Sequence, residues 1–266
     1  MRGSQRRLRH LPIRMLAPNM LTVLALCAGM SAVRFALLGR WELAVTAILI
    51  AGIFDGLDGR VARLLNGTSR FGAELDSLSD FVSFGVAPVL VLYMWSLSGI
   101  GGLGWIVVLG FAVCSALRLA RFNTALDDPD RPVWAANFFT GVPAPAGAFL
   151  ALLPMIASFQ LGDDFFRSPW LVGLVAGAVA FLMVSRMPTF SFKRVRVPRD
   201  WVLPVLVCVG LLAALTMIYP WESLLLIGAA YVVSLPLAGV SHGKQAALAR
   251  DRARAAPADE PVPPIG

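Results

Sequence analysis

The sequence predicts an all-helical integral membrane protein, and its composition and hydropathy pattern are the observations that predict it. Hydrophobic residues make up 58% of the 266 residues and charged residues only 15%, and the mean hydropathy is +0.73. A soluble domain of this length carries far more charge. Apolar runs of about 20 residues, the length that crosses the hydrocarbon core as a helix, recur along the chain. We therefore expect a bundle of transmembrane helices.

Eight apolar segments predict about eight spans. They are residues 18–38, 41–64, 76–96, 103–122, 142–160, 170–186, 201–219 and 221–240. We expect residues 18–240 to form a single transmembrane domain that contains any active site. A basic segment, residues 1–17, precedes it. The tail, residues 241–266, has the Pro-rich polar composition that is typical of disorder.

The distribution of basic residues predicts the orientation of the spans. The N-terminal segment MRGSQRRLRHLPIR is rich in arginine. If it is cytoplasmic, only Arg34, Arg40 and Arg167 of the 23 Lys and Arg residues fall on the opposite side. This bias follows the positive-inside rule and predicts a multi-pass protein of the cell (inner) membrane with both termini in the cytoplasm. The net charge of +7 is then a matter of topology and of attraction to membrane lipids, and it does not indicate a nucleic-acid partner.

Acidic residues are concentrated between two apolar runs, in FDGLDGRVARLLNGTSRFGAELDSLSDF, residues 54–81. This stretch holds Asp55, Asp58, Glu74, Asp76 and Asp80, although the whole chain has only 16 acidic residues. Asp55 and Asp58 share one helix face, and so do Asp76 and Asp80. The polar turn LNGTS makes the two helices antiparallel neighbours. We therefore expect four aspartates to converge at the cytoplasmic interface, while Glu74 lies off their face in solvent.

The four clustered carboxylates predict a metal site, because divalent cations relieve their mutual repulsion. Hard oxygen ligands favour Mg²⁺ or Mn²⁺. Two ions about 4 Å apart can hold the attacking and leaving oxygens of a phosphoryl displacement. Gly59 and Gly72 let a bulky group approach the backbone, and Arg63 is placed to neutralise a phosphate.

The spacing D-x-x-D-G-x-x-A-R, then eight residues, then G-x-x-x-D-x-x-x-D resembles the signature of the CDP-alcohol phosphotransferase family. The resemblance implies a helical, usually dimeric membrane enzyme that uses an alcohol to displace CMP from a CDP-linked substrate, with a divalent metal. It implies that Asp55, Asp58 and Asp76 bind metal, and that Asp80 completes the site and acts as the general base. It also implies a set of residues that hold the CDP phosphates: Gly59, Ala62, Arg63 and Gly72.

Three further stretches bear on the acceptor alcohol: SALRLARFN, FFTGVPAPAGA and FLMVSRMPTFSFK. They resemble the bacterial branch of the family that uses L-serine. This implies transfer of the phosphatidyl group from CDP-diacylglycerol to L-serine, giving phosphatidylserine and CMP. We expect direct attack of the serine hydroxyl, because no His or Cys lies in the motif to form a covalent intermediate. Candidates for binding the serine or the lipid phosphate are Arg118, Arg121, Asn123, Arg186 and Lys193.

Several alternatives stay open. Phosphatidylcholine and phosphatidylglycerophosphate synthases share the signature and differ in the acceptor. Intramembrane acids also mark cation transporters, although these place acids deep in several spans. A lipid-binding scaffold has no need of four facing carboxylates. At the residue level, Arg118 and Arg121 could be snorkelling charges, Asn123 a helix cap, and Arg186 and Lys193 ordinary cytoplasmic loop charges.

Overall fold

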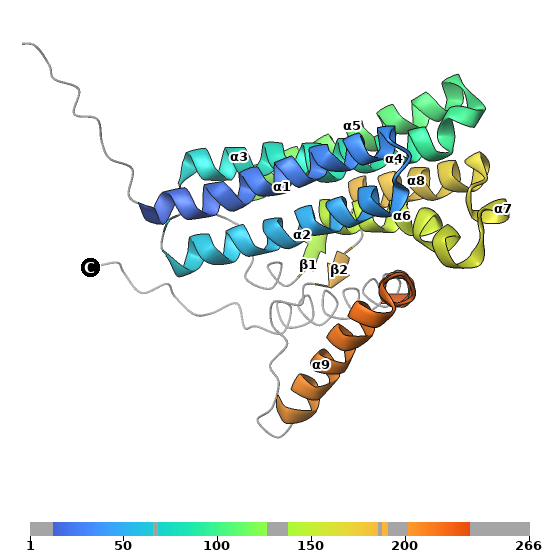
Figure 1. Ribbon diagram of the computed structural model, residues 1–266. Coiled ribbons are helices and arrows are strands. Elements are labelled where there is room, and N and C mark those ends of the chain that lie inside the picture. The colour runs from blue at the N-terminus through green and yellow to red at the C-terminus, as the bar shows by residue number, and fades with distance from the viewer. Residues whose placement is uncertain are drawn as a thin grey trace, which may run out of the picture.

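The computed structural model describes residues 13–65, 67, 69–126, 138–185, 188–190 and 202–234. Within these ranges the chain is almost entirely helical (Figure 1). The elements are α1 (Ile13–Leu37), α2 (Trp41–Leu64), α3 (Arg70–Asp80), η1 (Phe81–Val86), α4 (Ala87–Trp95), η2 (Leu97–Ile100), α5 (Gly102–Leu126), β1 (Phe138–Thr140), α6 (Ala144–Leu161), α7 (Asp163–Phe166), α8 (Pro169–Val184), β2 (Pro188–Phe190) and α9 (Val202–Ile218). A further helix, Pro220–Ser234, follows α9.

Four helices in the described part of the chain are long and apolar enough to cross a membrane. They are Leu16–Leu37, Arg70–Trp95, Gly102–Thr124 and Ala144–Leu161. Three apolar helices are shorter: Pro169–Val184, Leu203–Ile218 and Pro220–Ser234. The predicted span 41–64 coincides with α2, which carries charged residues at both ends and is not one of the four. The helical architecture is thus confirmed, with four helices of membrane-spanning length and composition in the described part of the chain, whereas the number of eight spans stays a prediction. Residues 1–12 and 235–266 lie outside the described ranges, so the cytoplasmic termini stay a prediction too.

The third predicted span begins earlier than expected and contains a π-helical segment. Its helix starts at Arg70, where the hydroxyl of Ser69 caps the N-terminus by accepting a 3.0 Å hydrogen bond from the N–H of Gly72. The π-helical segment η1 directly follows Asp80. At its end the N–H of Ala87 donates to the carbonyl of Val82, five residues back. Such segments are frequent at functional sites, and this one sets the direction in which the helix leaves Asp80.

A stripe of small residues on α1 brings its neighbours close. The stripe consists of Pro18, Thr22, Ala25, Gly29, Ala32 and Ala36, all of which are buried. A Cβ added at Gly29 would lie 2.5 Å from Oγ and 2.8 Å from Cα of Ser83 in η1. The hydroxyl of Ser83 donates a 3.3 Å hydrogen bond to the carbonyl of Ala25. Small side chains are what let membrane helices approach in this way.

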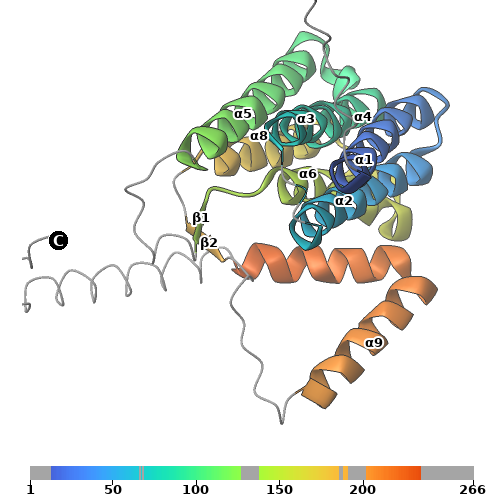
Figure 2. The same ribbon diagram turned by 90° about the vertical axis from the view of Figure 1, so that its left-hand side faces the viewer.

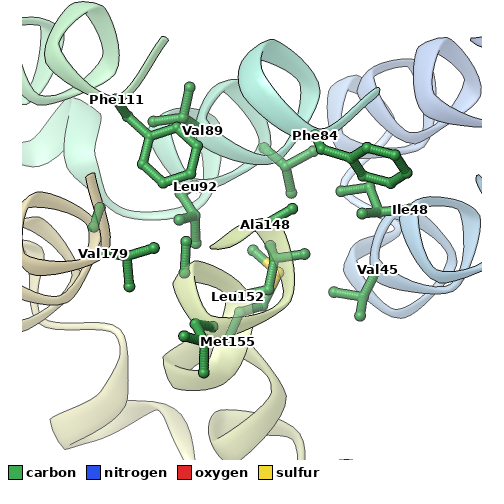
Figure 3. Packing of buried hydrophobic residues seen from close by; sticks show 14 of the residues in the cluster. Val45, Ile48, Phe84, Val89, Leu92, Phe111, Ala148, Leu152, Met155 and Val179 are labelled. Carbon is green, nitrogen blue, oxygen red and sulfur yellow. The ribbon is translucent and has the colours of Figure 1, made fainter. Parts of the chain in front are cut away.

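The core lies where α2, η1, α4, α5 and α8 surround α6 (Figure 3). Ala148, Leu152 and Met155 of α6 are fully buried, and Phe84 of η1 and Phe111 of α5 close the core on either side. This packing holds α2 and the helix from Arg70 to Trp95 in a fixed relation.

Of the last two helices, α9 lies outside the main bundle, whereas the helix Pro220–Ser234 packs against it. Figure 2 shows α9 slanting away from it, and the following helix passing beneath α6. That following helix packs on α6: the ring of Trp221 lies edge-on to Phe159 at 4.8 Å, and Gly228 abuts Leu153. The site described below is built mainly by α1 to α8, and Tyr231 of the last helix lies near Arg118.

A short β-ribbon is an addition to the expected all-helical fold. β1 and β2 pair antiparallel, with Phe138 opposite Phe190 and Thr140 opposite Pro188. Directly after β1, the chain passes the end of α8 at Gly141, which has φ +81°. A Cβ there would lie 2.5 Å from the carbonyl oxygen of Met183, so only glycine fits. The β-ribbon thus joins two of the stretches that resemble the serine-using branch, FFTGVPAPAGA and FLMVSRMPTFSFK.

Candidate active site

Three of the predicted aspartates meet between α2 and α3. Asp55 comes from α2, and Asp76 and Asp80 come from α3. Each offers one carboxylate oxygen, and these three oxygens all lie within 4.8 Å of one another. The helix spacing explains this, because residues four apart in α3 share the face that is turned toward α2.

Asp58, the fourth aspartate, is oriented differently. Its side chain is buried, with 5% exposed, and it is not part of the three-oxygen group. Its Oδ2 accepts a 2.8 Å hydrogen bond from the hydroxyl of Thr22 in α1. Asp58 and Asp76 both line an adjacent cavity of about 140 Å³, so the fourth acid borders the same site from another side.

The cavity lies between α1, α2 and α3. Most of its wall is made of small residues, and five of the lining residues are positions singled out in the sequence: Asp58, Gly59, Ala62, Gly72 and Asp76. The described lining residues are Pro18, Asn19, Thr22, Asp58, Gly59, Ala62, Gly67, Ser69, Gly72, Ala73 and Asp76. The α1 residues were not predicted, because the family signature begins at Asp55 and gives no signal in α1.

The two glycines of the predicted site, Gly59 and Gly72, are needed for different structural reasons. A Cβ at Gly59 would meet nothing within 4 Å, so its backbone is open to an incoming group. A Cβ at Gly72 would lie 2.8 Å from Oδ1 of Asn19 and 3.1 Å from Oγ of Ser69. Gly72 therefore lets α1 approach α3, whereas Gly59 faces free space. Arg63 lies exposed in the last turn of α2 and is not one of the described residues that line the cavity.

Arg118 is the basic residue next to the acids. It lies in α5 and is only 8% exposed. Its positive charge interacts favourably with the carboxylates of Asp80 and Asp55. Its guanidinium carbon lies 5.9 Å from the ring centre of Phe122. Its buried Nε has no hydrogen-bond partner among the residues that the structure describes. A buried N–H group without an acceptor destabilises the folded protein unless a ligand or a water molecule accepts its hydrogen bond.

Arg121 is engaged elsewhere. Its Nη2 donates to the carbonyl oxygens of Met183 and Ser185, each at 3.4 Å. These carbonyls belong to the C-terminus of α8, where a cation is favourable for the helix dipole. The two arginines, equivalent in the sequence, thus have different neighbours.

Asn123 contacts the helix that carries the acids. Its Nδ2 donates a 2.9 Å hydrogen bond to Oγ of Ser77, which itself donates to the carbonyl of Ala73 at 3.1 Å. Ser77 is the residue directly after Asp76, so Asn123 ties α5 to α3 beside the acid cluster. Arg186 and Lys193, also predicted site residues, lie outside the described residues.

Serine hydroxyls fix the acid-bearing helix to α1. Ser79 donates to the carbonyl of Thr22 at 3.1 Å, and Ser83 donates to that of Ala25 at 3.3 Å. Ser79 and Ser83 form a buried stripe next to the one formed by Asp76 and Asp80. The sequence shows this stripe as polar residues at the start of a span, but it does not show that α1 is its partner.

The donor set fits a hard divalent cation. The three-oxygen group contains carboxylates alone, and Oδ1 of Asp76 is buried without a hydrogen-bond partner in the described part of the chain. Carboxylate oxygens suit Mg²⁺ and Mn²⁺. Several carboxylates at this separation repel one another strongly unless a cation or protons intervene.

Comparison with known proteins identifies the class. Residues 15–184 match the family model described as CDP-alcohol phosphatidyltransferase, and residues 200–236 match one described as CDP-alcohol phosphatidyltransferase 2. The chain therefore belongs to the CDP-alcohol phosphatidyltransferase family, which confirms the resemblance seen in the sequence.

Curated relatives within this class carry one particular name, CDP-diacylglycerol--serine O-phosphatidyltransferase. A protein of that name from Mycobacterium tuberculosis is 42% identical over 221 residues, which is 83% of this chain and 77% of the relative. One from Helicobacter pylori is 34% identical over 82% of this chain and 88% of the relative. One from Bacillus subtilis is 32% identical over 66% of this chain and 91% of the relative.

Proposed function

We propose that this protein transfers the phosphatidyl group of CDP-diacylglycerol to L-serine, forming phosphatidylserine and CMP. The observation that carries the chemistry is the group of Asp55, Asp76 and Asp80 beside a cavity in a helical membrane protein. The names of relatives that match most of the chain support serine as the acceptor.

Asp55, Asp76 and Asp80 are proposed to bind two divalent ions, either Mg²⁺ or Mn²⁺. Asp58 is proposed as a further ligand of these ions. When bound, the metal would neutralise the diphosphate and make its phosphorus more electrophilic. The open backbone at Gly59 suits the approach of a phosphate, and Ala62 and Gly72 line the same cavity. Arg63, exposed at the end of α2, is proposed to reach the phosphates from outside the cavity.

In the proposed reaction, the serine hydroxyl oxygen forms a bond to the phosphatidyl phosphorus as the bond to CMP breaks. Asp80 accepts the hydroxyl proton, and CMP leaves with the bonding electron pair. Arg118 is proposed to bind the serine carboxylate, because its Nε has no other described partner and Asp80 is near. Arg121 contributes by holding the end of α8, and Asn123 by holding α3. Arg186 and Lys193 stay proposed contacts of the headgroup.

The hydrogen bonds of the nearby serines support direct attack. A covalent route needs a free nucleophile with an adjacent base. Ser77, Ser79 and Ser83 instead donate their protons to backbone carbonyls of Ala73, Thr22 and Ala25. Serine-independent exchange of labelled CMP into CDP-diacylglycerol would contradict the direct route.

The location of the remaining acids argues against a cation transporter. In the described part of the chain, the acids outside residues 54–81 are Glu42, Asp163, Asp164 and Glu222, and all are exposed near helix ends. No second set of described acids continues a path across the bundle. We further propose a homodimer in the inner membrane with the acid cluster facing the cytoplasm, which the positive-inside bias supports.

An acceptor panel tests the proposal. Purified protein in detergent with CDP-diacylglycerol and Mg²⁺ or Mn²⁺ is offered L-serine, glycerol-3-phosphate, inositol phosphate or choline, and the lipid product and CMP are measured. We expect a lipid product, phosphatidylserine, only when L-serine is the acceptor, and no product with the other three alcohols. Turnover with choline or glycerol-3-phosphate, and none with serine, would refute the acceptor and leave the family intact.

Substitutions test the acid cluster. Asp55→Asn, Asp58→Asn and Asp76→Asn should each lower turnover by orders of magnitude at saturating metal, because each removes a metal ligand. The exposed Glu74→Gln in the same helix is the matched control and should keep wild-type turnover. Near-normal activity of one Asp variant would remove that residue from the site.

A further inference from the structure

The helix Pro220–Ser234, which passes beneath α6 (Figure 2), presents one continuous face to the bundle. The residues that pack against the buried core recur at helical spacing: Trp221, Leu224, Leu225 and Tyr231. Gly228 belongs to the same face, because a Cβ added there would lie 2.5 Å from a side-chain carbon of Leu153 in α6. Residues three and four apart share one side of a helix, so the packed face extends from Trp221 to Tyr231.

Tyr231 brings this face to the candidate active site. It lies near Arg118 of α5, whose charged neighbours include Asp80 and Asp55. The ring of Tyr231 is partly buried against the core. Among the described residues, Arg118 is the one whose charge acts on the Tyr231 hydroxyl, and no hydrogen bond joins the two side chains. A buried tyrosine hydroxyl usually has a hydrogen-bond partner.

Arg118 and Tyr231 together offer two donors to a bound group. Nε of Arg118 is buried and lacks an acceptor within the part of the chain that the structure describes. A guanidinium only donates hydrogen bonds, and a phenol hydroxyl donates one. An anion that lies beside both side chains would therefore satisfy both donors.

We propose that the Tyr231 hydroxyl and the Arg118 guanidinium together bind the carboxylate of the acceptor serine, which makes Tyr231 a specificity-determining residue. This rests on the proposed function and adds a residue of the last described helix to the acceptor subsite. A carboxylate has two oxygens with about four lone-pair sites, so it accepts from both donors at once.

A neutral donor suits this position better than a second cation. A further Lys or Arg beside Arg118 would be repelled by it, and it would also attract the carboxylates of Asp80 and Asp55. The tyrosine hydroxyl adds a hydrogen bond without adding charge. An alcohol that lacks the carboxylate would leave both donors unpaired, and a site built to hydrogen-bond a substrate group rejects analogues without that group.

Removal of the Tyr231 hydroxyl tests the assignment. Tyr231→Phe keeps the packed ring, so the Tm should not change. The KM for L-serine should rise by roughly 10–100-fold, because a hydrogen bond to a charged group is lost. The kcat and the KM for CDP-diacylglycerol should each stay within about twofold, because the lost contact binds serine equally in the ground state and the transition state.

Tyr219→Phe is the matched control, since Tyr219 is 54% exposed after the end of α9. It should keep the kcat and both KM values. An unchanged KM for serine in Tyr231→Phe, or an equal rise of the KM for both substrates, would overturn the proposal.

A serine analogue without the carboxylate tests which end of the acceptor Tyr231 contacts. Ethanolamine has the hydroxyl and the amine of serine but no carboxylate. Its inhibition constant against L-serine should therefore be the same in the unsubstituted protein and in Tyr231→Phe, to within about twofold. A rise of that constant as large as the rise of the KM for serine would place the contact elsewhere and overturn the assignment.

The two proposals fail in different ways, because the acceptor panel uses the unsubstituted protein. Phosphatidylserine formation in the panel, together with a normal KM for serine in Tyr231→Phe, would refute the role of Tyr231 alone. A panel in which serine is not used would refute the proposed acceptor, and the carboxylate subsite with it.

Discussion

The hydroxyl of Thr22 lies 2.8 Å from Oδ2 of Asp58, and it connects two helices across 36 residues of sequence. It turns Asp58 toward α1, away from the group formed by Asp55, Asp76 and Asp80. The same residue also accepts a hydrogen bond from Ser79 at its backbone carbonyl. Thr22 therefore orients one predicted metal ligand and anchors the helix that carries two others.

Loss of the Thr22 hydroxyl should weaken the metal site. Thr22→Val keeps the side-chain shape but removes the side-chain donor of Asp58, so we expect roughly 10–100-fold weaker activation by Mg²⁺ or Mn²⁺. The measurement is turnover against metal concentration. Thr46→Val is the matched control, since the Thr46 hydroxyl bonds only the carbonyl of Glu42 in its own helix. Identical metal dependence of both variants would contradict the positioning role.

A double-mutant cycle separates the two roles of Asn123 that the sequence leaves open. If Asn123 acts by holding Ser77, Asn123→Ala and Ser77→Ala should be non-additive in kcat/KM, with a coupling of about 0.5–1.5 kcal/mol. If Asn123 binds substrate instead, its substitution should cost the same with or without Ser77. Additive losses would therefore exclude the positioning role.

The two arginines of α5 should respond differently to substitution. Arg118→Ala should raise the KM for serine by about 10–100-fold, since a hydrogen bond to a charged group contributes roughly 1.5–3 kcal/mol. Arg121→Ala should lower the Tm, because it frees the carbonyls at the end of α8, and it should leave the KM for serine within about twofold. The measurements are steady-state kinetics with varied serine and thermal unfolding in detergent. A raised KM in Arg121→Ala with a normal Arg118→Ala would reverse the assignment.

Close packing of α1 on η1 should make Gly29 sensitive to a single methyl group. Gly29→Ala places Cβ 2.8 Å from Cα of Ser83, and we expect a loss of about 1–3 kcal/mol, seen as a lower Tm. Gly110→Ala in α5 is the matched control, because its Cβ would meet nothing within 4 Å. The control should be neutral or stabilising by up to about 1 kcal/mol, since alanine favours helix. A neutral Gly29→Ala would show that α1 and η1 can separate without cost.

The local part of the site was predictable from the sequence. Spacing placed Asp55 and Asp58 on one helix and Asp76 and Asp80 on the next, and the apolar runs on both sides placed those helices in a membrane bundle. The expected direct packing of α2 on α3 is replaced by packing of both helices on α1. These features follow from helical periodicity and hydropathy, which act over a few residues or over one span. The family followed from the same spacing, and the comparisons confirmed it.

Only the tertiary structure decided how those helices meet. Spacing gives the face of a residue but not its neighbour across an interface, so Asp58 and Thr22 could not be paired in advance. For the same reason Gly59 and Gly72 were alike in the sequence, although one faces open space and the other Asn19. Arg118 and Arg121 were also alike until the end of α8 supplied acceptors for one of them. Contacts between residues far apart in the chain depend on the packing of the whole bundle, and that packing assigned these side chains their different roles.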